Sequence, residues 1–184
     1  MVKGRLQTLS SWLDTLPPEL LSARPFIVSL QGSLAALTGN TELALTLFNQ
    51  AVNGMKLPAD RQNLARALSW RAALHRMMGN LNLAITDSRE SLALIENDAD
   101  MRKVKAEDLR GIGLCLNKQG KLKDALTWLN QALSTSLSIG DVENANIIRR
   151  GLGATLENLG RYSEAKSLYQ SALEHWQKTE NNVW

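Results

Sequence analysis

The 184-residue chain repeats itself with a period of about 40 residues. Four segments align on a glycine that is followed by alanine five positions later, and successive glycines are 40, 41 and 40 residues apart. A small residue also stands seven positions before each glycine and twelve positions after it. The aligned glycines are Gly39, Gly79, Gly120 and Gly160. Because four segments agree at four offsets, each segment is expected to fold into the same structural unit.

The residue types within each unit predict a pair of antiparallel helices. The turn glycine can adopt the left-handed conformation that ends a first helix. After the third turn, Leu122, Leu126, Leu129 and Leu133 recur at helical spacing. Close approach of two helices requires a small residue at their crossing, so the small residue before each turn should face the alanine after it. Neither helix can bury its apolar face alone, and the units must therefore stack into a solenoid.

Composition agrees with an all-α protein and narrows the possible partners. Leu and Ala supply 53 residues, whereas Val and Ile supply 13, which favours helices over strands. The longest uncharged stretch, residues 25–41, is too short and too polar to span a membrane. A single Cys115 and the lack of a secretory signal near the first residues predict a cytoplasmic protein. The net charge of +3 is a small excess, so direct nucleic-acid binding is the weakest of the interaction hypotheses.

The order of small residue, turn glycine, alanine and second small residue resembles the tetratricopeptide repeat (TPR). The fourth unit matches the family signature most fully, through Gly153, Gly160, Tyr162, Ala165, Tyr169 and Ala172. The resemblance implies a TPR-like α-solenoid, a right-handed superhelix of antiparallel helix pairs. The period exceeds the 34 residues of the family. The additional residues are expected to lengthen the helix ends and the connections between units, as at residues 54–60 and 139–143.

The alignment also predicts how the chain is divided. It indicates a single solenoid of about nine helices, with neither end resembling a polar capping helix. We therefore expect a fragment of a longer protein, whose exposed repeat ends could self-associate. The expected parts are an orphan second helix at 1–17, repeats at 18–57, 58–98, 99–139 and 140–180, and the start of another repeat at 181–184.

The first segment suggests a more specific relationship. Residues 12–25, followed by an apolar helix and Gly39, resemble the start of the TPR-like sensor region in MalT-type regulators. These are large bacterial ATP-dependent transcription activators of the LuxR group. The resemblance implies a sensor module for signal transduction that binds a protein, a peptide or a small inducer. The alternative is a stand-alone scaffold that binds a peptide in its concave groove.

No pattern in the sequence indicates catalysis. Gly111 and Gly113 are spaced like part of a phosphate-binding loop, but they lie inside a first helix, where packing explains them better. The two histidines, His75 and His175, lie on different helices, and His75 is expected to be a partly buried packing residue. Cys115 aligns with leucines and reads as a core residue. We predict no catalytic residue, no cofactor and no metal site.

The TPR resemblance implies that the first helix of each unit lines a concave groove. The groove would be apolar in the first unit and polar, mostly basic, in the later ones, which suits a peptide with an acidic group. A solvated charged face is the alternative. Trp70 could either line the groove or pack in the core, whereas Trp12 and Trp128 are expected to pack between repeats. The predicted groove residues are Phe26, Arg66, Ser69, Trp70, Arg76, Met77, Glu107, Arg110, Asn117, Lys118, Arg150, Glu157 and Asn158.

Overall fold

The computed structural model describes residues 8, 11–13 and 15–181, and every regular element in this part is a helix. The predicted all-α fold is confirmed. The helices are α2 (Pro18–Ala23), α3 (Pro25–Leu37), α4 (Thr41–Gly54), α5 (Arg61–Met77), α6 (Leu81–Leu94), the 3₁₀ turn η1 (Ala99–Met101), α7 (Arg102–Lys118), α8 (Leu122–Ser138), α9 (Val142–Asn158) and α10 (Tyr162–Asn181). None of the described helices combines the length and apolarity needed to cross a bilayer.

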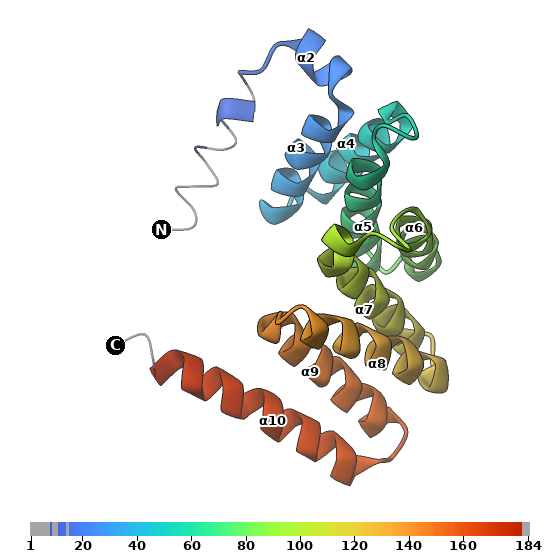
Figure 1. Cartoon of the computed structure of the whole chain (residues 1–184), viewed down its shortest axis with the longest axis vertical. Coiled ribbons are helices and arrows are strands. Elements are labelled where there is room, and N and C mark those ends of the chain that lie inside the picture. The colour runs from blue at the N-terminus through green and yellow to red at the C-terminus, as the bar shows by residue number, and fades with distance from the viewer. Residues whose placement is uncertain (1–7, 9–10, 14, 182–184) are drawn as a thin grey trace.

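Helices α3 to α10 form antiparallel hairpins that stack along the long axis of the molecule in chain order (Figure 1). The second helix of each hairpin packs on the first helix of the next, so that α4 contacts α5, α6 contacts α7 and α8 contacts α9. The first helices α3, α5, α7 and α9 also contact one another, more extensively than the second helices do. The stack therefore curves toward the first helices, whose exposed side we call the inner face.

The turns inside the hairpins confirm the role of the repeated glycines. Gly39 and Gly79 have φ values of 86° and 82°, and Gly120 and Gly160 both have 74°. A side chain would be strained at such angles, which explains why glycine recurs at this position. Gly140, between α8 and α9, also has a positive φ of 70°.

Helix crossings follow a rule of complementary size. A Cβ atom on Gly32 would lie 3.0 Å from the ring of Phe48, and one on Gly113 would lie 2.6 Å from Leu129. A Cβ atom on Gly153 would lie 2.5 Å from the ring of Tyr169. The glycine thus makes room for a large residue sixteen positions later. In hairpin α5–α6 these two positions instead hold Ala72 and Ser88, and both residues are buried.

Two expectations about length and packing need correction. Only residues 139–141 connect α8 to α9, because the additional residues are absorbed into helices α7, α8 and α9 of 17 residues each. Residues 55–60 do form a longer connection, as predicted. Trp128 packs against two core clusters, but Trp12 is 68% exposed. In the described part of the first segment, only Leu13 is buried. The predicted orphan helix lies largely outside the described residues.

Candidate binding site

Three polar residues break the apolar pattern of the repeat, and they come together between α5, α6 and α7. Ser88 occupies the position of the large residues described above, and Ser91 occupies a position of conserved small size across the four units. Asp108 stands where the other first helices have apolar residues. The equivalents of Ser91 are Ala51, Ala132 and Ala172, and those of Asp108 are Ile27, Ala67 and Ile148.

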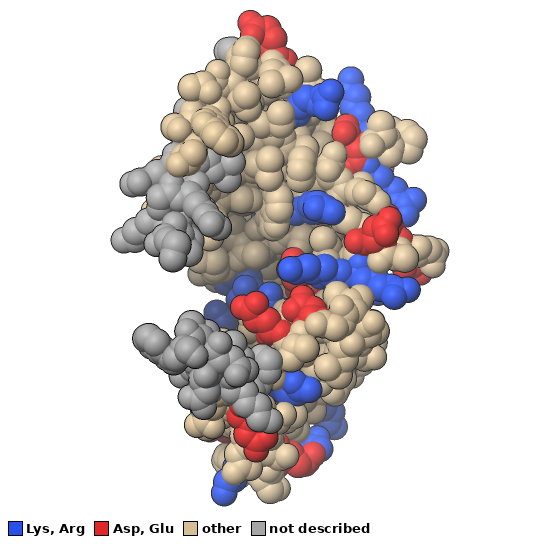
Figure 2. Space-filling model, turned by 60° about the vertical axis from the view of Figure 1, so that its left-hand side comes forward, with Lys and Arg blue, Asp and Glu red and all other residues tan. Residues whose placement is uncertain are grey.

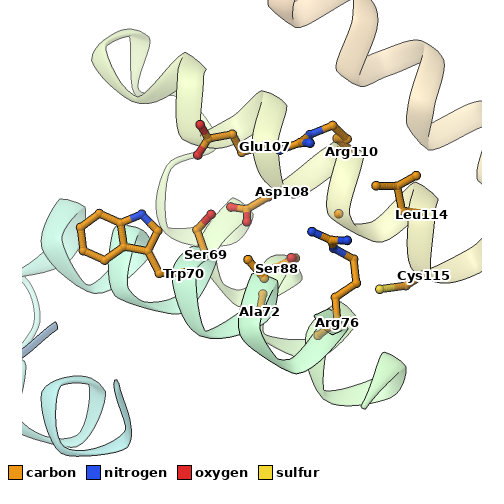
Figure 3. Close-up of a pocket in the computed structure, with 13 residues that line it drawn as sticks. Ser69, Trp70, Ala72, Arg76, Ser88, Glu107, Asp108, Arg110, Leu114 and Cys115 are labelled. Carbon is orange, nitrogen blue, oxygen red and sulfur yellow. The ribbon is translucent and has the colours of Figure 1, made fainter. Parts of the chain in front are cut away.

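Ser88 and Asp108 line a cavity of about 70 Å³ between the three helices (Figure 3). Ser88 helps to create the space, because it leaves unfilled the volume that a leucine or an aromatic ring occupies at this position in the other hairpins. The remaining lining residues are Ser69, Trp70, Ala72, Ala73, Arg76, Ala84, Glu107, Arg110, Gly111, Leu114 and Cys115.

Asp108 supplies a buried carboxyl group to this cavity. The residue is 1% exposed, and its Oδ2 atom has no hydrogen-bond partner among the described residues. Burial raises the pKa of Asp108 to about 7, although the nearby hydroxyl groups of Ser91, Ser69 and Ser88 act in the opposite direction. The carboxyl group is therefore about half protonated at neutral pH and can donate or accept a hydrogen bond.

Two guanidinium groups lie at the other side of the cavity. Arg110 is half-buried, and its Nε atom has no partner. Burial, and then the charge of Arg76, lower the pKa of Arg110. Burial raises the pKa of Glu107, whereas Arg110 lowers it. Neither arginine forms an ion pair within the described part of the chain, although the charge of Glu107, which also lines the cavity, acts on Arg110.

An apolar cleft of about 430 Å³ lies next to this cavity, between α3 and α5. Trp70 lines both spaces and stacks on Phe26 with ring centroids 5.8 Å apart. The ring of Trp70 thus packs on Phe26 and also borders open space. Leu37 and Met77 border the cleft with exposed fractions of 70% and 66%. Figure 2 shows largely uncharged surface in the upper part of the molecule and charges of both signs gathered across its middle.

The structure brings together only part of the predicted groove row. Ser69, Trp70, Arg76, Glu107 and Arg110 surround the cavity, whereas Phe26 and Met77 belong to the apolar side.

The other predicted groove residues lie apart from the cavity. The side chain of Asn158 donates to that of Asn117 over 2.8 Å, and Glu157 accepts a hydrogen bond of 3.1 Å from Tyr169. The Nη2 atom of Arg66 lies 3.7 Å from the sulfur of Met101. Lys118 and Arg150 are exposed and line neither the cavity nor the cleft.

A second polar cluster lies inside hairpin α5–α6, away from the cavity. Arg71 donates two hydrogen bonds to Asp87 at 2.7 and 2.8 Å, and both side chains are largely buried. The Nε2 atom of His75 lies 3.9 Å from the same carboxylate, and burial lowers the pKa of the histidine. His75 is thus a buried packing residue. Cys115 is fully buried, and burial raises the pKa of its thiol.

No group of three or more potential metal ligands occurs among the described residues. The side chain of His175 lies outside them.

Comparison with protein families settles the nature of the repeat. Two models described as tetratricopeptide repeat match residues 63–138 and 148–181, which together exceed half of the chain. The chain belongs to the tetratricopeptide repeat family. A comparison with curated proteins finds no match.

Solved structures confirm the TPR-like solenoid. The chain is similar to aspartyl phosphate phosphatase F from Bacillus subtilis, with a TM-score of 0.77 and 15% identity over 95% of this chain and 45% of that one. It thus spans less than half of the phosphatase. MamA gives a TM-score of 0.67 at 18% identity, covering 98% of this chain and 94% of that chain. YrrB gives a TM-score of 0.63 at 16% identity, covering 94% of this chain and 79% of that chain. These identities indicate a shared fold.

Proposed function

We propose that this TPR chain is a non-catalytic interaction module that binds a peptide segment of a partner protein on its inner face. The observation that carries the proposal is the apolar cleft between α3 and α5, which adjoins a cavity lined by two guanidinium groups that form no ion pair among the described residues. YrrB is described as a TPR protein with an unusual peptide-binding site, which supports the same use of the fold.

The chemistry of the two spaces defines the peptide. The cleft, with Leu37 and Met77 exposed at its border, would bury a bulky apolar side chain. Arg76 and Arg110 would attract an acidic group on the same segment, because neither is neutralised by an ion pair among the described residues. We infer a peptide that carries both features a few residues apart.

We also propose a biological setting for this module. The resemblance of residues 12–25 to MalT-type proteins supports a sensor region within a larger cytoplasmic transcription regulator, where a small inducer or self-association could act with the peptide. A stand-alone scaffold is the alternative. The sequence of the complete gene tests this setting: the regulator hypothesis requires a nucleotide-binding or helix-turn-helix domain beside the repeats.

Selection from a display library of random dodecapeptides tests the peptide proposal. We expect the selected peptides to share an apolar residue and a nearby Asp or Glu. The double variant Leu37→Glu with Met77→Glu should bind them at least roughly tenfold more weakly, because it removes one buried apolar contact. Both residues are exposed, so the helical circular dichroism should not change.

Leu137→Glu is the matched control, because Leu137 is 50% exposed on α8 and lines neither space. It should bind the peptides like the unmodified chain. Equal binding by the control and the double variant would contradict the use of the cleft. Arg76→Glu combined with Arg110→Glu should also abolish binding of acidic peptides without loss of helical structure.

A further inference from the structure

Three polar groups with unused hydrogen-bonding capacity meet at the cavity between α5, α6 and α7. The Oδ2 atom of Asp108 and the Nε atom of Arg110 are buried without partners, and no hydrogen bond or ion pair involves Arg76 in the described part of the chain. A buried polar group without a hydrogen-bond partner is unfavourable, because it has lost its bonds to water. Such groups gathered around one space indicate that something else completes their hydrogen bonds.

We propose that this cavity is a binding site for a single carboxylate group. One oxygen of the ligand would accept hydrogen bonds from the guanidinium groups of Arg76 and Arg110. Its other oxygen would accept the hydrogen of the Asp108 carboxylic acid. No covalent bond changes, and binding takes up a proton from solution when Asp108 is ionised beforehand.

The charges around the cavity favour an anion over a cation. From α5 the cavity is faced by Arg76, and from α7 by Glu107, Asp108 and Arg110, while its α6 lining of Ala84 and Ser88 is uncharged. Lys103 and Arg66 act on Glu107, and Asp141 acts on both Glu107 and Arg110, from outside the cavity. An ammonium ligand would face two guanidinium groups, whereas a carboxylate relieves the repulsion between them.

The size of the cavity limits the ligand to a small group. A single water needs roughly 10–15 Å³ of space measured in this way, so the 70 Å³ of the cavity admit a carboxylate with one carbon attached. An acidic side chain of the bound peptide and a free small carboxylic acid share this chemistry. Only the first source depends on the proposed peptide function.

An NMR titration of the ¹⁵N-labelled chain tests the site, with acetate and with the selected acidic peptides as probes. Both pH 6 and pH 8.5 are needed, in buffers without carboxylates. Because binding requires a protonated Asp108, whose pKa is about 7, the affinity should fall about 30-fold between these pH values. Asp108→Asn keeps a hydrogen-bond donor and should bind with less than about a threefold dependence on pH.

A second variant removes the space itself. Ala72→Gly combined with Ser88→Leu reproduces the pairing of Gly113 with Leu129 in the next hairpin, so it should fill the cavity while preserving the helices. Binding of acetate should be lost in this variant. If it does not fold, the pH dependence of the unmodified chain and of Asp108→Asn still decides the question.

The two probes separate the sources of the carboxylate. Saturable shifts with acetate support a free acid, whereas shifts with acidic peptides alone support a side chain. Equal affinity for peptides whose Asp or Glu is replaced by Asn or Gln, together with no saturable acetate binding, overturns the carboxylate site and leaves peptide binding in the cleft intact. Acetate binding that survives in the cavity-filled variant overturns it as well.

Discussion

Hairpins α5–α6 and α7–α8 share one backbone plan but differ in the chemistry of their interiors. In α7–α8, Gly113 accommodates Leu129, and the crossing is apolar. In α5–α6, the corresponding crossing of Ala72 and Ser88 leaves a cavity. The ion pair of Arg71 and Asp87 occupies positions that hold Ile112 and Trp128 in the next hairpin.

The difference shows which features the repeat requires and which it tolerates. The repeat tolerates a crossing without a large residue, since residues 78–80 and 119–121 connect the helices of the two hairpins through the same kind of glycine turn. The buried polar groups of α5–α6 are not needed for this architecture. Buried ion pairs rarely stabilise a fold more than apolar residues would. The same hairpin also borders the cavity, which suggests that α5–α6 gives up stability for binding.

The largest expected effect comes from breaking the ion pair of α5–α6. Asp87→Leu, which introduces the residue found at the equivalent position of α4, should lower the free energy of unfolding by about 3–5 kcal/mol, because it leaves the largely buried Arg71 without a carboxylate partner. Urea denaturation followed by circular dichroism measures this loss. The triple variant with Arg71→Ile, His75→Leu and Asp87→Leu replaces the polar cluster with apolar residues and should recover most of the lost stability. A triple variant no more stable than Asp87→Leu would show that α5–α6 requires its polar interior.

The next effect depends on pH. The pKa of Asp108 is about 7 in the folded chain against an ordinary value of 3.8, so folding binds a proton between these values and stability falls as the pH rises through this window. Asp108→Asn removes this loss. It should be about as stable as the unmodified chain at pH 4 and more stable by roughly 2–4 kcal/mol at pH 8. Denaturation at both pH values measures the difference, and a stability gap independent of pH would contradict the assignment.

The sequence contained enough information for the hairpins but not for the cavity. Turn glycines and small residues act within one hairpin, so their spacing could be read directly. The cavity depends on side chains from three helices. Only the lining residues on α5 and α7 that were predicted to face the groove, such as Arg76 and Arg110, could be found from the sequence. Asp108 was not predicted, because its equivalents in the other first helices are apolar residues. The available signal was its polarity at a position that holds Ile27 and Ile148 in other units.

Filling the crossing of α7–α8 should have a smaller effect. Gly113→Ala would place a Cβ atom 2.6 Å from Cγ of Leu129 and 3.2 Å from the carbonyl oxygen of Ala125. The backbone atom cannot move aside easily, so the two helices must separate. We expect a loss of about 1–3 kcal/mol in the free energy of unfolding. Unchanged stability in thermal denaturation would show that the close approach is not required.

The smallest effect tests the same helix two residues earlier, on the side that faces the cavity. A Cβ atom on Gly111 would lie 3.6 Å from the hydroxyl oxygen of Ser88, an ordinary contact, with nothing else nearby. Gly111→Ala should therefore raise the free energy of unfolding by about 0.5–1 kcal/mol, because alanine loses less backbone entropy than glycine in a helix. Thermal denaturation beside Gly113→Ala provides the comparison. If the stability changes at the two glycines have opposite signs, α7 has free space on its cavity side and close packing on the side of Leu129. If both variants are destabilised, α6 packs as tightly on α7 as α8 does.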